Sequence, residues 1–424
     1  MVHRGGDNLS NRTLRMRIDG GGALLEPWLD ELYKIGAEPG GGAYRPLYGT
    51  AWAEAGDCVE RWMKKAGLET RRDAVGNLWG RLDGTEKGKV IVTGSHIDTV
   101  RHGGRLDGAL GIVAGLTATE ALMKARGKPK RSLDVVAICE EEGSRFPTNF
   151  WGSRAIVGSI GKDEADTIVD PNGVTIAQAM RERGLDPAKI GSAARDDIDA
   201  FVELHIEQGA VLETTRQPLA VVSAIAGGVH LEIVVTGRAD HAGTTPMDLR
   251  HDALVGASVM IQAIESITRA IGAPAVATVG RIRAEPDQIN VVPGRVVFTV
   301  DLRHSDPGAR RALEERTRSL CRTIAAERGL ELEVRVLQER PPVPMHAEVR
   351  AVLTRAAQEC GVRATELVSG AGHDAQILAA RCKVGMLFVP SVGGRSHCPE
   401  EHTDPGHLEL GARVLVRTLE LLAY

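Results

Sequence analysis

The chain of 424 residues is poor in aromatic residues, has no paired cysteine motif and carries no strong excess of either charge. Aromatic residues make up only 3% and the formal net charge is −4, which argues against base stacking and phosphate-binding basic surfaces. The six cysteines show no CxxC spacing, which favours reduced thiols. No apolar run approaches the roughly 18 residues of a membrane helix, and residues 1–22 lack a signal-peptide core. We therefore expect a cytoplasmic protein with a loose N-terminal tail and no nucleic-acid or membrane partner.

The chain is long enough for two domains, and its apolar segments alternate between strand and helix patterns. Helical periodicity occurs at Trp52–Ala66 and Gly111–Ala125. Short apolar runs of the strand type occur at Val90–Thr93, Leu133–Ile138, Ala200–Leu204 and Gly385–Val389. This alternation predicts an α/β domain with helices on both faces of its sheet.

The middle of the chain has the element order β-α-β-β-α-β, which is the ferredoxin-like pattern. Helices are expected at His251–Ile271 and Pro307–Arg328. The strands of this segment are expected at His230–Thr236, Ala275–Arg283, Arg295–Arg303 and Glu331–Leu337. We therefore expect a large metal-binding domain at 23–225 and 341–424, interrupted by an inserted ferredoxin-like domain at 226–340.

Polar clusters that could carry chemistry occur at five places, residues 94–100, 106–111, 139–146, 205–209 and 396–401. They contain these candidate ligands: His96, Asp107, the triplet Glu140–Glu142, His205 and His397. In α/β sheets, ligands gather beyond the carboxyl ends of the strands. Because the clusters follow apolar runs, we expect them to converge on one site although they span 300 residues of sequence.

Imidazole and carboxylate groups are ligands for zinc, manganese and similar divalent ions. Any one cluster alone would more often be structural, since an Asp-Gly turn or a run of glutamates is ordinary. Three histidines, one aspartate and one glutamate suffice for two ions that share a bridging carboxylate. The residues by themselves leave open which glutamate of the triplet is a ligand, and they do not choose among zinc, manganese, cobalt and nickel.

Together these clusters resemble the dinuclear metallohydrolases of the aminoacylase and glutamate-carboxypeptidase superfamily. The resemblance covers nearly the whole chain after Leu24, and Glu141-Glu142-Gly143 matches a Glu-Glu-Gly motif of that superfamily. It implies two divalent ions per subunit and five ligands: His96, Asp107, Glu142, His205 and His397. It also implies that Asp107 bridges the ions and is followed by a cis peptide bond, that Glu141 is the general base, and that Asp98 orients His96.

Within the superfamily the chain is most similar to the ureidohydrolases, namely allantoate amidohydrolases and N-carbamoyl-L-amino-acid hydrolases. The similarity lies in residues 36–42, 73–78, 241–247 and 369–375, whereas residues 142–147, residues 150–153 and Gln376 are typical of the allantoate branch. Arg45-Pro46-Leu47 departs from the Thr-Arg-Leu order usual in the group.

This closer resemblance implies a small ureido substrate that carries a carboxylate. Arg303 would clamp the carboxylate, because a planar guanidinium pairs with two oxygens at once. Its companions would be Gln208, Asn290, Gly370, Ala371, Gly372 and His373. His241 would stabilise the oxyanion, often from the partner subunit of a homodimer.

Three other readings remain open from the sequence. The chain could be a carbamoyl-amino-acid hydrolase or aminoacylase, which substrate profiling would separate from an allantoate enzyme. A non-catalytic binding protein on the same scaffold would be expected to lack a ligand or Glu141, and all are present. Residues 370–375 also fit G-x-G-x-x-A, but a dinucleotide fingerprint belongs to a first βα turn, and these residues lie late in the chain.

Overall fold

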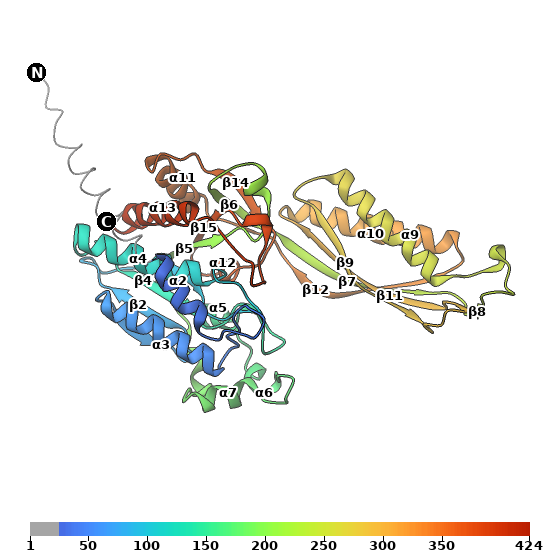
Figure 1. Ribbon diagram of the computed structural model, residues 1–424, viewed down its shortest axis with the longest axis horizontal. Helices are drawn as coiled ribbons and strands as arrows, with labels where there is room; N and C mark the ends of the chain where they lie inside the picture. The colour runs from blue at the N-terminus through green and yellow to red at the C-terminus, as the bar shows by residue number, and fades with distance from the viewer. Residues whose placement is uncertain (1–24) are drawn as a thin grey trace, which may run out of the picture. The chain divides into compact units, whose positions relative to one another are not determined.

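The computed structural model describes residues 25–424, and the tail expected at residues 1–22 lies outside them. The described chain divides into two compact units (Figure 1). Unit 1 contains the described residues up to 223 together with 345–367 and 373–424. Unit 2 contains 224–344 and the short segment 368–372, so a few residues from the last part of the chain group with the middle part.

Unit 1 is built on a mixed sheet whose central strands are parallel. Its order is β1 (Glu69–Arg72), β2 (Leu78–Leu82), β4 (Leu133–Ile138), β3 (Val90–His96), β5 (Ile198–Ile206), β15 (Lys383–Val389) and β6 (Ala220–Ile225), with β14 (Thr365–Ser369) paired to β6. The register sets His96 opposite Ile138, and His205 opposite Phe388. The carboxyl ends of β3, β4, β5 and β15 therefore share one edge of the sheet.

The helices of unit 1 pack on this sheet and on one another. They are α2 (Leu25–Lys34), α3 (Thr50–Lys65), α4 (Ala109–Arg126), α5 (Trp151–Val157), α6 (Glu164–Thr167), α7 (Ile176–Glu182), α8 (Val211–Thr214), α11 (Ala347–Glu359), α12 (Asp374–Leu378) and α13 (Pro405–Ala423), with 3₁₀ turns η1 (Pro187–Ala193) and η3 (Val392–Gly394). Helix α4 is buried along most of its length, and α13 packs against it. An α-helix that is apolar on all sides is stable only where other elements cover every side of it.

Unit 2 is a four-stranded antiparallel sheet with two helices packed against it (Figure 1). The strand order is β12 (Glu331–Arg340), β7 (Gly227–Thr236), β11 (Arg295–His304) and β9 (Val276–Glu285). Helices α9 (Ala253–Ile271) and α10 (Pro307–Glu327) complete the order β-α-β-β-α-β. A ribbon of β8 (Asp240–His241) and β10 (Val291–Val292) and the turn η2 (Met247–Leu249) complete the unit. The short strand β13 (Val343–Pro344) pairs with the last two residues of β6 and ends the order of the larger sheet.

The expected helices and strands are present, with differences at their ends. Strands β3, β5 and β12 run two to three residues further than the apolar patterns indicate, because ladder hydrogen bonds continue into polar positions. Helix α9 begins at Ala253, two residues later than expected, because the Asp252 side chain accepts the N–H groups of Leu254 and Val255 and caps the helix.

Helix α9 is also an exception to the expected lack of membrane-length segments. By length and composition alone it could cross a membrane. Its buried residues recur every three or four positions, at Ala253, Ala257, Met260 and Ile264, and the helix packs on β7, β9 and β11. The apolar residues of α9 therefore form the helix face that packs on the sheet of unit 2.

The packing of α4 on the sheet gives a test of the fold. A Cβ at Gly111 would lie 2.6 Å from the Ser95 Cβ and 2.9 Å from the Leu204 carbonyl oxygen, whereas one at Gly406 would meet nothing within 4 Å. We expect Gly111→Ala to lower the free energy of unfolding by about 1–3 kcal/mol. Gly406→Ala, the matched control in α13, should be neutral or slightly stabilising, since alanine favours helices. Denaturant unfolding measures both, and equal stability of the two variants would contradict this packing.

Candidate metal centre

The five predicted metal ligands come together at the edge of the sheet in unit 1. His96 ends β3 and His205 is the second-last residue of β5. Glu142 follows β4 by four residues, Asp107 precedes α4, and His397 lies in the loop after β15. Parallel strands bring these side chains together because their carboxyl ends share one edge.

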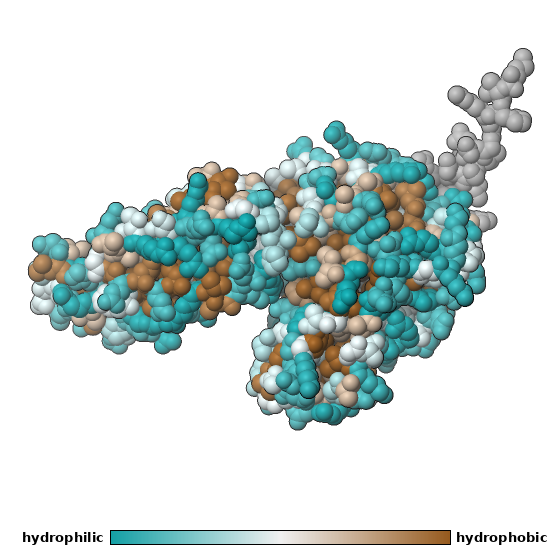
Figure 2. All heavy atoms as spheres, turned by 180° about the vertical axis from the view of Figure 1, so that it is seen from behind, coloured by the Kyte–Doolittle hydropathy of each residue, from teal (hydrophilic) through white to brown (hydrophobic). Residues whose placement is uncertain are grey.

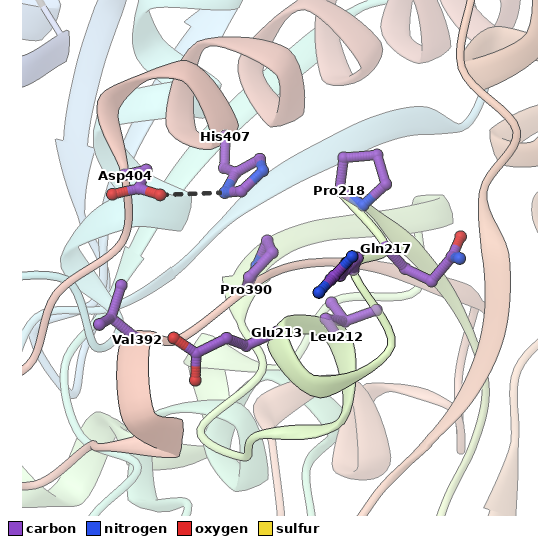
Figure 3. A pocket seen from close by; sticks show the side chains of 9 residues that line it. Leu212, Glu213, Gln217, Pro218, Pro390, Val392, Asp404 and His407 are labelled. Carbon is purple, nitrogen blue, oxygen red and sulfur yellow. Dashed lines mark ion pairs between the residues drawn. The ribbon is translucent and has the colours of Figure 1, made fainter.

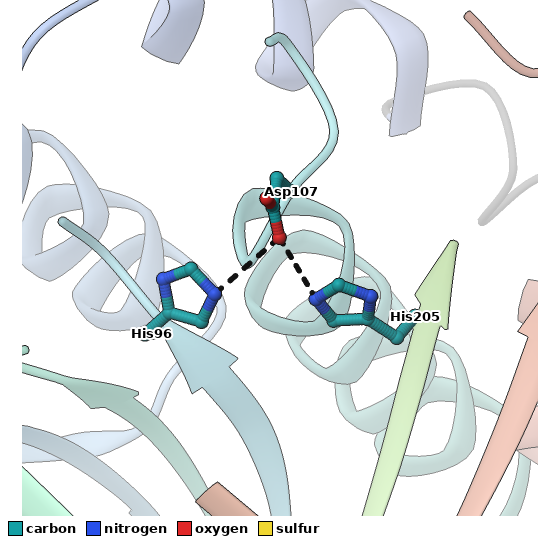
Figure 4. A group of neighbouring side chains, drawn as sticks. All are labelled: His96, Asp107 and His205. Carbon is teal, nitrogen blue, oxygen red and sulfur yellow. Dashed lines mark ion pairs between the residues drawn. The ribbon is translucent and has the colours of Figure 1, made fainter. Parts of the chain in front are cut away.

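The carboxylate of Asp107 lies at the centre of the group (Figure 4). Its Oδ1 is 3.5 Å from His96 Nε2 and 3.1 Å from His205 Nε2. Its Oδ2 is 3.0 Å from His397 Nε2, and the same nitrogen is 3.3 Å from Glu142 Oε1. Each oxygen of Asp107 therefore faces a different set of ligand atoms.

Two sets of potential metal ligands share Asp107. One contains His96 and His205, and the other contains Glu142 and His397; within each set the ligand atoms lie within 4.8 Å of one another. The nitrogen and oxygen donors suit zinc, manganese and similar divalent ions. His96, Asp107 and His205 are buried, a setting in which charged groups need partners or a metal. The donor set therefore fits divalent cations.

The tautomers of the two buried histidines follow from their neighbours. His96 Nδ1 lies 3.1 Å from the Asp98 carbonyl oxygen and 3.3 Å from Asp98 Oδ1. His205 Nδ1 lies 2.9 Å from the Ile206 carbonyl oxygen. Because these neighbours only accept hydrogen bonds, each Nδ1 carries a hydrogen. Each Nε2 faces Asp107, and it would offer its lone pair to a metal ion once it has lost its own hydrogen.

The charged groups of the site change one another's pKa values. Burial opposes ionisation of Asp107, but hydrogen bonds from His205, His397 and His96 outweigh it and hold the pKa of Asp107 well below its usual range. Hydrogen bonds to Asp107 and Glu142 raise the pKa of His397 to about 10. Burial and the neighbouring Glu142 raise the pKa of Glu141 well above its usual range. Binding of cations would compete with protons for these groups.

The structure separates the three members of the glutamate triplet. Glu140 turns inward, where its Oε2 accepts the Trp151 N–H at 2.8 Å and its Oε1 accepts the Gly143 N–H. Glu141 and Glu142 instead form a ligand-atom group with His96. The backbone N–H groups of Glu141 and Glu142 donate to the two oxygens of Asp98 at 3.0 and 3.2 Å. Asp98 therefore holds the end of β3 and the loop after β4 together.

Two of the predicted substrate-binding residues lie in unit 1. Gln208 Nε2 donates to Asp107 Oδ2 at 3.1 Å, so this side chain is directly beside the metal ligands. His373 is buried, and its ring centre is 4.6 Å from that of His205. Burial and the charge of His205 lower the pKa of His373 well below its usual range, which keeps the imidazole neutral.

The other predicted substrate-binding residues lie in unit 2. Asp301 pairs with Arg303, with Nη2 to Oδ2 at 2.7 Å, and Arg303 Nη1 donates to the Gly370 carbonyl oxygen at 2.6 Å. Ala371 and Gly372 belong to the same short segment. His241 is exposed on β8, and its Nδ1 accepts the N–H groups of Gly243 and Thr244, so its Nε2 carries the hydrogen. Exposed Asn290 is next to β10, the strand partner of β8.

One expectation about the backbone is wrong. Among residues 25–424 only Ala273–Pro274 and Glu285–Pro286 are cis, so the bond after Asp107 is trans. Gly108 makes the turn instead, with a φ of 67°, and its N–H donates to His205 Nε2 at 3.3 Å. A Cβ there would lie 2.4 Å from the His96 carbonyl oxygen, so the turn requires glycine.

Some polar residues near the centre had no role assigned from the sequence. Buried Arg45 donates through Nε to the Ile97 carbonyl oxygen at 2.8 Å, so it supports the segment after β3. Glu401 is also buried and contacts the backbone of Asp107. Its only sequence signal is its place next to Glu400 in the last cluster, and adjacent glutamates are ordinary at a surface.

A cavity of about 260 Å³ lies in unit 1 (Figure 3). It is lined by Leu212, Glu213, Arg216, Gln217, Pro218, Pro390, Val392, Asp404 and His407. None of the predicted site residues lines it. This cavity therefore has no part in the site expected from the sequence.

Comparison with known proteins shows the family of the chain. Residues 92–421 match peptidase family M20/M25/M40. The chain belongs to this family. An allantoate amidohydrolase of Bacillus subtilis (strain 168) is 42% identical over 94% of the chain and 97% of the relative. An N-carbamoyl-L-amino-acid amidohydrolase of Paenarthrobacter aurescens is 39% identical over 94% of the chain and 97% of the relative.

A solved structure of an amidase of the hydantoinase/carbamoylase family from Burkholderia multivorans matches this family member with a TM-score of 0.89 at 35% identity, over 95% of the chain and 98% of that structure. The M20/M25/M40 family consists of metal-dependent hydrolases, and the relatives are amidohydrolases. This M20 family member is therefore a hydrolase that acts on C–N bonds, and its buried histidines and carboxylates supply candidate metal ligands.

Proposed function

We propose that this hydrolase cleaves the ureido C–N bond of a small substrate that carries a carboxylate, with allantoate the first candidate. N-carbamoyl-L-amino acids are the alternative, because relatives of both kinds cover almost the whole chain at similar identity. The observation that carries the proposal is the pair of ligand sets that share Asp107, with Glu141 beside Glu142. Hydrolysis of the ureido group consumes one water and releases the amine, ammonia and carbon dioxide.

We propose that His96 and His205 hold one divalent ion, Glu142 and His397 hold a second, and Asp107 bridges them. The ions would be zinc or manganese, with cobalt or nickel as alternatives. Bound there, they would lower the pKa of a water molecule and polarise the ureido carbonyl. Glu141 would accept the proton of the attacking water and return it to the leaving nitrogen. Asp98 would fix Glu141 through its backbone N–H.

In this proposal unit 2 is a ferredoxin-like lid and dimerisation domain at 226–340, inserted between 23–225 and 341–424. Arg303 binds the substrate carboxylate, and its pairing with Asp301 fixes the guanidinium. Asn290, Gln208, His373 and the segment Gly370–Gly372 contact the rest of the substrate. His241 Nε2 carries a hydrogen and can donate to an oxyanion. The enzyme would act in the cytoplasm as a homodimer.

Glu141→Gln tests the proposed base. Because an amide does not accept the proton, we expect turnover to fall by a factor of about 10² or more while metal and substrate binding are kept. Metal content, substrate binding and ammonia release measure the three properties. Exposed Glu86→Gln is the matched control and should behave as wild type. Near-normal turnover of Glu141→Gln would assign the base to another residue.

Substrate comparison tests the preference for allantoate. Allantoate carries a second ureido group where an N-carbamoyl amino acid has an apolar side chain, and a site built to hydrogen-bond that group rejects analogues without it. We expect a higher kcat/KM for allantoate than for any of several N-carbamoyl-L-amino acids under the same metal. A higher value for a carbamoyl amino acid would favour the alternative and leave the metal chemistry unchanged.

Assembly is the third point to test. Apolar side chains reach the surface of unit 2 (Figure 2), including Val255 on α9, Val276 and Ile282 on β9, and Val336 and Leu337 on β12. Contiguous exposed apolar surface marks interfaces with other chains, and the proposed dimer would cover part of this surface. In addition, His241 is exposed on a unit that carries none of the five candidate ligands. These features support a homodimer in which His241 serves the partner's metal centre.

Mixed dimers test this arrangement. Glu141→Gln and His241→Ala should each be nearly inactive alone, but a mixed dimer contains one complete site if His241 acts on its partner. We expect refolded equal mixtures to recover about a quarter of wild-type activity, since half of random dimers are mixed and each has one of two sites. Absence of recovery in confirmed mixed dimers would show that His241 acts within its own subunit.

A further inference from the structure

Glu401 connects two separate loops of the candidate metal centre. Its side chain is 5% exposed. Its Oε1 accepts the backbone N–H of Leu106 at 2.7 Å and that of Asp107 at 3.0 Å. Its Oε2 accepts the hydroxyl of Ser396 at 2.7 Å. One carboxylate therefore joins the segment before α4 to the loop that carries His397.

These contacts distinguish Glu401 from a metal ligand. Both of its oxygens accept hydrogen bonds from the surrounding chain, and among the described residues the potential ligand sets do not include it. It acts instead on the residues next to the ligands. Ser396 adjoins His397 in sequence, and its Oγ is 3.4 Å from Asp107 Oδ2.

The chain leaves space for this side chain. A Cβ at Gly104 would lie 2.1 Å from Glu401 Oε1 and 2.5 Å from Glu401 Cβ. Adjacent Glu400 has a different environment, because its side chain is 60% exposed and pairs with Arg395 at 3.0 Å. Of these two neighbouring glutamates, only Glu401 is buried and contacts the backbone of Asp107.

We propose that Glu401 is a positioning residue that fixes Asp107 between the two ions and holds the His397 loop against it. The inference rests on the proposed dinuclear function. Asp107 can bridge only while each of its oxygens faces its own ligand set, so its backbone must not rotate. Two N–H groups held by one buried oxygen restrict that rotation, and the Ser396 hydroxyl ties the second loop to the same carboxylate.

The test compares Glu401→Ala, Glu401→Gln and Glu400→Ala. Glutamine keeps an oxygen for both N–H groups and can donate its amide to Ser396 Oγ, so it should preserve the positioning without the charge. We expect Glu401→Ala to weaken binding of at least one of two zinc ions by about ten- to a hundredfold. The zinc affinity of Glu401→Gln should stay within about threefold of the wild-type value. The zinc affinity of Glu400→Ala should equal the wild-type value. Bound zinc per chain is measured against a series of chelator concentrations.

Each outcome has a defined meaning. Wild-type zinc affinity in Glu401→Ala would overturn the inference. So would an equal loss in Glu401→Gln, because the charge and not the hydrogen bonding would then act on the ions. If Glu401→Ala does not fold, Glu401→Asp replaces it, since a side chain shorter by one methylene group cannot span both loops; wild-type affinity there would overturn the inference. A wild-type protein that binds no divalent ion would instead refute the proposed function.

Discussion

The contact of the Asp107 carboxylate with three imidazole rings is the interaction around which the candidate metal centre of unit 1 is built. His96 and His205 face one oxygen and His397 faces the other. Burying such charges is costly unless they are paired and hydrogen-bonded. The surrounding fold meets this condition, because Nδ1 of each buried histidine is held by an oxygen and the backbone of Asp107 is held by Glu401. A bridging carboxylate of this kind suits two cations.

The sheet and its first long helix determine where that carboxylate lies. Parallel pairing of β3 with β4 and β5 brings the strand ends to one edge, and α4 begins two residues after Asp107. The helix approaches the strands closely because Gly111 has no side chain between them. Gly108 provides the turn that leads from the ligand into the helix. The site is therefore attached to rigid elements, and rigid attachment keeps ligand atoms at fixed distances.

The two units divide the polar residues by chemistry. Unit 1 carries the histidines and carboxylates that suit cations, together with Gln208 beside Asp107. Unit 2 carries Arg303, which donates hydrogen bonds to Asp301. It also carries His241, whose Nε2 has a hydrogen. Groups that suit cations and groups that suit anions are thus built on separate scaffolds.

The sequence by itself indicated the central strands of unit 1, the element order of unit 2, and Asp107 with three histidines and a glutamate triplet as candidate ligands, because apolar periodicity and strand-end clusters are local patterns. From chemistry alone it left open which glutamate of Glu140–Glu142 is a ligand; resemblance supplied the choice of Glu142, which the structure groups with Asp107 and His397. Only the tertiary structure revealed Glu401 at Asp107, the trans bond before Gly108, and segment 368–372 in unit 2. Side-chain direction and hydrogen bonds between residues 294 positions apart depend on how distant segments pack, and no local pattern encodes them.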